Sequence, residues 1–189
     1  MLPSLDKRST SMPKRVSKRL VIDASVARSS GDENAVFPTS KRCRDFLLAT
    51  LDICHQVVMT EAIRDEWNRH QSRFARGWRV SMVARRKLHV VDIASDDKLR
   101  EKISRVAARA QDCETMLKDA HLLEAAIATD QIVISLDETV RVLFIGAAIR
   151  VGEIRRILWV NPDKIEEDCV SWLERGARSE RRRQLGFVE

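Results

Sequence analysis

Short apolar runs alternate along the chain with longer segments in which apolar residues recur at helical spacing. Four runs are almost wholly apolar and only three or four residues long: residues 20–22, 57–59, 132–134 and 157–160. Runs of this length and composition are typical of strands that are buried on both faces. A fifth run, residues 88–91, is interpreted as a strand or a connector.

Helices are predicted between these strands. The segments with helical periodicity or strong helix-forming composition are residues 40–50, 61–83, 97–109, 112–128 and 138–149, and a further helix is expected from Pro162 onward. Thr60 can cap the second of them, and Asp96 and Asp97 can open the third. Because strands and helices alternate, the pattern favours an α/β fold with a mainly parallel central sheet covered by helices on both faces.

The length of 189 residues suits one domain with an extension at each end. We expect a basic flexible arm over residues 1–18, a folded domain over residues 19–165, and a C-terminal helix with a basic tail over residues 166–189. The polar stretch at residues 28–34 is interpreted as a loop.

The formal net charge of +6 is what a protein that meets phosphate often carries. Arg69, Arg73 and Arg76 are predicted to lie on one face of the helix over residues 61–83, either as a track for phosphates or as an ordinary solvated face. The four cysteines form no C-x-x-C pair, and no run approaches the roughly 18 apolar residues of a membrane span. We therefore expect a cytoplasmic protein without a zinc ribbon or a membrane segment.

Carboxylates follow two of the predicted strands directly. Asp23 comes after residues 20–22, and Asp137 closes the segment that begins with residues 132–134. In open parallel sheets the carboxyl ends of the strands meet at one rim, so these two acids are expected to lie close together. Glu66 and Asp119 lie on helices that can reach the same rim. Read singly, each has a simpler explanation: Asp23 as a turn residue, Asp137 as a helix cap, and the other two as solvated helix acids.

Four carboxylates gathered at one rim would repel one another unless a cation lay between them. A set of oxygen donors suits Mg²⁺ or Mn²⁺ rather than zinc. Such an ion can polarise a phosphodiester and activate water.

The segment Val21-Ile22-Asp23-Ala24-Ser25 resembles the opening strand of PIN domains, and residues 119–137, from an Asp on an alanine-rich helix to a strand ending in Ser-x-Asp, are similar to the second half of that family. Glu66 matches the acid on the helix after the second strand. The resemblance covers about residues 19–165. It implies a PIN-like three-layer α/β/α sandwich, with Asp23, Glu66, Asp119 and Asp137 as catalytic metal ligands and Ser25 and Ser135 as supporting hydroxyls.

Family members are typically Mg²⁺- or Mn²⁺-dependent RNA endonucleases, many of them toxins of toxin-antitoxin pairs. The resemblance thus implies a ribonuclease that hydrolyses phosphodiester bonds. Alternatives left open are a PIN-like module that binds RNA or protein without cutting, and a structure-selective DNA nuclease. An antitoxin or another protein partner, and a homodimer, also stay open.

Overall fold

The computed structural model describes residues 16–31 and 37–187, and within these ranges five strands form one sheet. The strand order is β3-β2-β1-β4-β5, and every neighbouring pair is parallel. The elements are β1 (Arg19–Ile22), α1 (Ala24–Ser29), α2 (Thr39–Asp52), β2 (Gln56–Met59), α3 (Glu61–His70), α4 (Arg73–Ala84), β3 (Leu88–Val90), α5 (Asp97–Val106), α6 (Ala110–Ile127), β4 (Ile132–Ile134), α7 (Glu138–Ala148), η1 (Gly152–Ile154), β5 (Leu158–Val160), η2 (Ile165–Glu167), α8 (Cys169–Glu174) and η3 (Arg181–Arg183).

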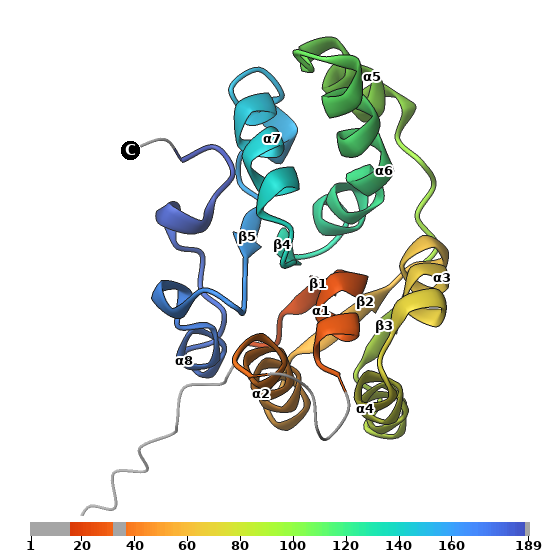
Figure 1. Cartoon of the computed structure of the whole chain (residues 1–189), viewed down its shortest axis with the longest axis vertical. Helices are drawn as coiled ribbons and strands as arrows, with labels where there is room; N and C mark the ends of the chain where they lie inside the picture. The colour runs from red at the N-terminus through yellow and green to blue at the C-terminus, as the bar shows by residue number, and fades with distance from the viewer. Residues whose placement is uncertain (1–15, 32–36, 188–189) are drawn as a thin grey trace, which may run out of the picture.

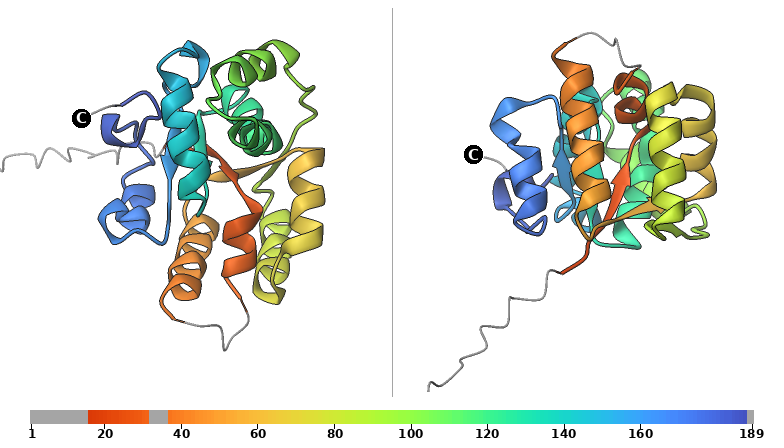
Figure 2. Two further views of the ribbon diagram at one scale, coloured as in Figure 1. Left: turned by 45° about the horizontal axis from the view of Figure 1, so that its top comes forward. Right: turned by 90° about the horizontal axis from the view of Figure 1, so that it is seen from below.

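The sheet is the middle of three layers, as the sequence predicts. Figure 1 shows α5, α6 and α7 on one side of the strands and α1, α2 and α4 on the other. The right-hand view of Figure 2 looks from below, with α2 and α4 in front of the strands. Strands β1, β2, β4 and β5 supply the centre of the core, where almost every side chain is buried. This burial on both faces explains why the strands are short, continuous apolar runs.

The segment predicted as one helix over residues 61–83 is two helices, so that prediction was wrong. Helix α3 ends at His70, and Ser72 caps α4 by accepting a hydrogen bond from the Ala75 backbone N–H at 3.1 Å. The Ser72 backbone N–H donates to the Ala27 carbonyl, which ties the break to α1. Apolar residues keep a helical spacing across the break because Trp67 of α3 and Trp78 of α4 both pack into the same core. Their rings stack with centroids 5.9 Å apart.

Two other boundaries differ from the expectation. A short helix, α1, follows Asp23 directly, so the predicted loop over residues 28–34 begins only at Ser30, and residues 32–34 lie outside the described ranges. The C-terminal helix does not begin at Pro162, because Asn161 and Pro162 are buried and the chain turns there before α8 starts at Cys169. Of the predicted basic arm, residues 1–15 also lie outside the described ranges.

The C-terminal residues pack against the edge of the sheet rather than forming a free tail. Gln184 forms an isolated antiparallel bridge with Leu158 of β5, and the Leu185 backbone N–H donates to the Ile157 carbonyl at 2.9 Å. Arg183 is buried. Over the described residues, no helix is both long and apolar enough to cross a membrane.

Candidate functional site

Asp23 is held at the carboxyl end of β1 by two serine hydroxyls. The Ser135 hydroxyl donates to Asp23 Oδ2 at 2.8 Å, and the Ser25 hydroxyl donates to the same oxygen. The Asp23 backbone N–H donates to the Ile134 carbonyl at 2.9 Å, because β1 and β4 are neighbours in the sheet. The supporting role that the resemblance implies for Ser25 and Ser135 therefore matches their contacts, and Asp23 lies in a fixed orientation.

Asp137 serves two purposes. Its Oδ1 accepts the Val140 backbone N–H at 2.9 Å, so it is the cap of α7 that the simpler interpretation expected. Its own backbone N–H donates to the Ser135 hydroxyl at 3.1 Å, which links it to the group that orients Asp23. Capping occupies one carboxylate oxygen, and the residue still lines the cavity described below.

Glu66 extends from α3 toward α6. Its Oε2 lies 3.3 Å from Nε2 of His121, close enough for an ion pair but without the alignment of a hydrogen bond. The contact with His121 holds the pKa of Glu66 below its ordinary value. Burial acts to lower the pKa of His121, but the carboxylate of Glu66 raises it above its ordinary value overall. Glu66 is therefore ionised, and its position is set by α6 as well as by its own helix.

Asp119 shows that the acids converge. Burial and then the negative charge of Asp23 raise its pKa from 3.8 to about 6, and Glu66 adds to the rise. Lys118 and His121 act in the opposite direction without cancelling it. Asp23 and Glu66, which are far from Asp119 in the sequence, thus lie close enough to raise the pKa of its carboxyl group.

All four predicted acids line one cavity, which has a volume of about 260 Å³. The remaining lining residues are Ala24, Ser25 and a group of basic residues: Arg28, Arg69, His70 and Lys118. The acids lie among groups that can contact phosphate, and of the three arginines predicted as a phosphate track only Arg69 reaches this cavity. Arg73 and Arg76 lie on α4, beyond the break after α3, and are exposed.

Sequence reasoning missed four of the residues around the acids. Arg28 and Lys118 line the cavity, and so does His70, while His121 contacts Glu66. Helical spacing contained a signal for one of them, because His70 follows Glu66 by four positions and so lies on the same face of α3. His121 follows Asp119 by only two positions, which places the two side chains on different faces of α6. No comparable signal marks Arg28, which reaches the cavity only because α1 forms where a loop was expected.

The donor set fits a hard divalent cation. Carboxylate oxygens are the ligands that Mg²⁺ and Mn²⁺ prefer. Burial, and after it the negative charges of Asp23 and Glu66, raise the pKa of Asp119, and a divalent ion would offset both effects. Within the described ranges, no three His, Cys, Asp or Glu side chains are grouped closely enough to hold an ion as they stand. The carboxylates share a cavity without forming a closed cage.

No protein-family model matches this chain, and no curated protein matches it either. The likeness to PIN domains therefore depends on the residues and their placement alone.

Proposed function

We propose that this chain is a PIN-like, divalent-metal-dependent endonuclease that hydrolyses the phosphodiester bonds of RNA. The observation that carries the proposal is the single cavity lined by Asp23, Glu66, Asp119 and Asp137 with basic residues beside them. A simple solvated surface would not raise the pKa of Asp119 to about 6 through burial and the charges of two other acids.

Asp23, Glu66, Asp119 and Asp137 would hold the Mg²⁺ or Mn²⁺, which when bound supplies Lewis-acid stabilisation of the phosphate and an activated water. Ser25 and Ser135 fix the carboxylate of Asp23, so that one ligand keeps its orientation as substrate enters. Preorganisation of this kind is what second-layer hydrogen bonds contribute to metal sites.

The basic residues of the cavity bind the nucleic-acid backbone. Arg28, Arg69 and Lys118 line the same space as the acids, so they can contact phosphates on either side of the bond that is cut. Their positive charge also offsets the repulsion between the acidic cavity and a polyanion. An RNA substrate suits the cytoplasm, and we place the protein there.

The test is cleavage of end-labelled single-stranded RNA and DNA by the purified chain, with Mn²⁺ or with EDTA. We compare Asp23→Asn and Asp119→Asn with Glu114→Gln, which removes an exposed acid from α6 outside the cavity. Because loss of an outer-shell partner of a metal ligand already costs 10- to 100-fold, loss of a ligand should reduce cleavage by more than about 100-fold. The Glu114→Gln variant should cut normally.

Mn²⁺ binding measured by calorimetry provides a readout that does not depend on activity. Cleavage that continues in EDTA, or that is unaffected by both Asp variants, would show that this site is not a metal-dependent nuclease. Binding of RNA without any cleavage would instead support a PIN-like binding module, and cleavage of DNA alone would change the substrate class.

A further inference from the structure

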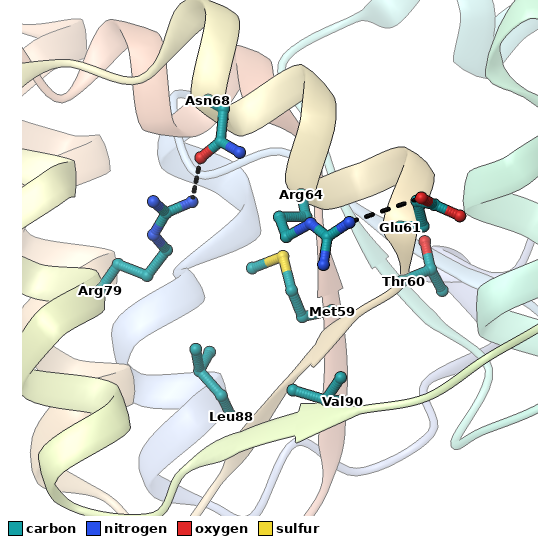
Figure 3. Close-up of a pocket in the computed structure, with 8 residues that line it drawn as sticks. All are labelled: Met59, Thr60, Glu61, Arg64, Asn68, Arg79, Leu88 and Val90. Carbon is teal, nitrogen blue, oxygen red and sulfur yellow. Dashed lines mark hydrogen bonds and ion pairs between the residues drawn. The ribbon is translucent and has the colours of Figure 1, made fainter.

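A second pocket lies on the other side of α3 from the carboxylates. Its volume is about 270 Å³, and it lies between α3, α4 and the two strands β2 and β3. Figure 3 shows its residues: Arg64 and Asn68 of α3 in the upper part of the view, Arg79 of α4 at the left, Met59 in the centre, and Leu88 and Val90 below. Thr60 and Glu61 complete the lining.

The floor of this pocket is apolar and partly open. Met59 and Val90 are partners in the parallel register of β2 and β3, and Leu88 is two positions before Val90, so these side chains lie on one face of the sheet. The Val90 side chain is 74% exposed although it belongs to a strand. The floor can therefore accept the flat or apolar part of a ligand.

Arg79 in the wall lacks a counter-ion. Its Nη1 donates to Asn68 Oδ1 at 2.9 Å, and no carboxylate of the described residues lies within ion-pair distance of it. Partial burial and the charge of Arg76 lower the pKa of Arg79. Arg64, by contrast, pairs loosely with Glu61 at 3.5 Å and Asp65 at 3.7 Å. A half-buried guanidinium that bonds only to a neutral amide is suited to an anionic ligand.

A series of four arginines begins at the carboxylate cavity and ends at this pocket. Arg69 lines the carboxylate cavity, and Arg73, Arg76 and Arg79 follow at spacings of three on α4, so they share one face of that helix. Over the described residues, none of these four arginines forms an ion pair. The first arginine of the series therefore lines one pocket, and the last lines the other.

We infer that the second pocket binds a nucleotide of a single-stranded nucleic acid whose scissile phosphate lies in the carboxylate cavity. The phosphate contacts Arg79, with Arg64 nearby, and the base and ribose lie on Met59, Leu88 and Val90. The Asn68 amide N–H₂ is placed to donate to the base edge. This inference rests on the proposed nuclease function and adds a strand-binding subsite to it.

The distance between the two pockets predicts a dependence on substrate length. Glu66 and Arg64 or Asn68 lie on opposite faces of α3, and a helix with its side chains is about 10 Å across. A dinucleotide whose one phosphate lies in the carboxylate cavity cannot also reach Arg79. A longer strand occupies both pockets, so only the longer strand should be sensitive to changes in the second one.

The experiment measures binding of fluorescein-labelled oligo-uridines of two and about 12 nucleotides, the longer of which lies within the range of single-strand site sizes. It uses the full chain in EDTA with Arg79→Met, which keeps the aliphatic stem, and Val90→Glu, which places a carboxylate at an exposed point of the floor. The control Arg105→Met removes an exposed arginine of α5 that pairs with Glu101. Thermal unfolding confirms that each variant is folded.

Loss of one charge-assisted contact should weaken binding of the longer strand by about tenfold in Arg79→Met and leave the shorter one unchanged. The slope of log affinity against log salt should fall by about one for the longer strand. In Mn²⁺ the same variant should raise KM for the longer strand with little change in kcat.

Failure of this inference differs from failure of the proposed function. If the wild type cuts RNA with Mn²⁺ but Arg79→Met and Val90→Glu bind the longer strand as tightly as Arg105→Met does, the subsite is refuted and the nuclease stands. If the wild type neither binds nor cuts RNA, both are refuted. A glutamate-rich peptide that binds through Arg79, while RNA binding ignores that residue, would make the pocket a peptide site instead.

Discussion

Two clusters of ionisable side chains meet the N-terminal end of α7, one through Asp137 and the other through Glu138. Asp137 lines the carboxylate cavity, whereas the next residue, Glu138, lies 3.5 Å from Arg141 in a second cluster near the C-terminus. In that second cluster the charges alternate: Arg141 contacts Glu167 at 2.9 Å, Arg183 contacts Glu167, and Arg183 Nε donates to Glu180 at 2.9 Å. The cavity instead gathers four acids, and burial together with the charges of Asp23 and Glu66 raises the pKa of Asp119.

The difference separates a structural role from a functional one. Arg183 is only 1% exposed, and its guanidinium also lies over the Trp172 ring at 5.1 Å from the centroid. Burial and the charge of Arg141 lower the pKa of Arg183 to about 10, which leaves it charged near neutral pH. Opposite charges can thus be buried because each has a partner, whereas the acids of the cavity have no such set of partners among the described residues, and the proposed metal ion would supply one.

The largest effect is expected from removing one partner in the C-terminal cluster. Glu167→Gln removes the buried carboxylate that both Arg141 and Arg183 contact and leaves Glu180 as the carboxylate partner of Arg183. Removing one partner of a buried pair typically costs about 3 to 5 kcal/mol. Chemical denaturation measures the free energy of unfolding. The control is Glu166→Gln, which changes the exposed neighbour. A loss below about 1 kcal/mol would mean that the cluster is no tighter than a surface ion pair.

The opposite sign is expected in the cavity. Asp119→Asn removes a half-buried charge that Asp23 and Glu66 repel, so in EDTA the variant should be more stable than the wild type at pH 7. In Mn²⁺ the same variant should no longer cleave RNA. The rise of the pKa from 3.8 to about 6 sets an upper limit near 3 kcal/mol, and with solvent in the cavity we expect about 1 to 2 kcal/mol.

The pH dependence identifies the cause of this gain. The folded protein binds the Asp119 proton more tightly than the unfolded chain does, so the penalty is full above the folded pKa of about 6 and disappears below 3.8. The difference between Asp119→Asn and the wild type should therefore shrink as pH falls through this range. Glu114→Gln should show no such difference. A variant that is less stable at pH 7 would contradict the idea that the carboxylates repel one another.

The sequence predicted this cavity better than it predicted the C-terminal cluster. Asp23 and Asp137 could be placed at one rim because strand ends in a parallel sheet meet there, and Glu66 and Asp119 followed from their position on neighbouring helices. The break between α3 and α4 was hidden, since Trp67 and Trp78 keep a helical period across it.

The role of Arg183 was hidden for another reason. A run of three arginines near a chain end is typical of a solvated tail, and its burial depends on Glu167 and Trp172, which are brought to it only by the fold. Local patterns therefore predicted the elements and the rim, whereas the contacts between distant segments needed the structure.

The smallest effect concerns two histidines, His121 and His55, whose pKa values are shifted in opposite directions by their surroundings. His121 faces the carboxylate of Glu66, which raises its pKa, whereas His55 is buried beside α8. His55 Nδ1 accepts the Lys18 backbone N–H at 3.1 Å, and its Nε2 donates to the Leu173 carbonyl at 3.0 Å, which is the pattern of a neutral ring. Burial, followed by the charges of lysines nearby, lowers the pKa of His55.

The pKa of His55 is lower in the folded protein than its value of 6.5 in the unfolded chain. The neutral ring therefore contributes stability at pH values above 6.5, and this contribution is lost as the pH falls below 6.5. His55→Gln should therefore flatten the decline in the free energy of unfolding between about pH 7 and pH 5, measured by urea denaturation. His121 should act in the opposite direction, because its raised pKa adds stability at acid pH. If His55→Gln leaves the acid side of the stability profile unchanged while His89→Gln alters it, the buried ring is not the group that takes up the proton.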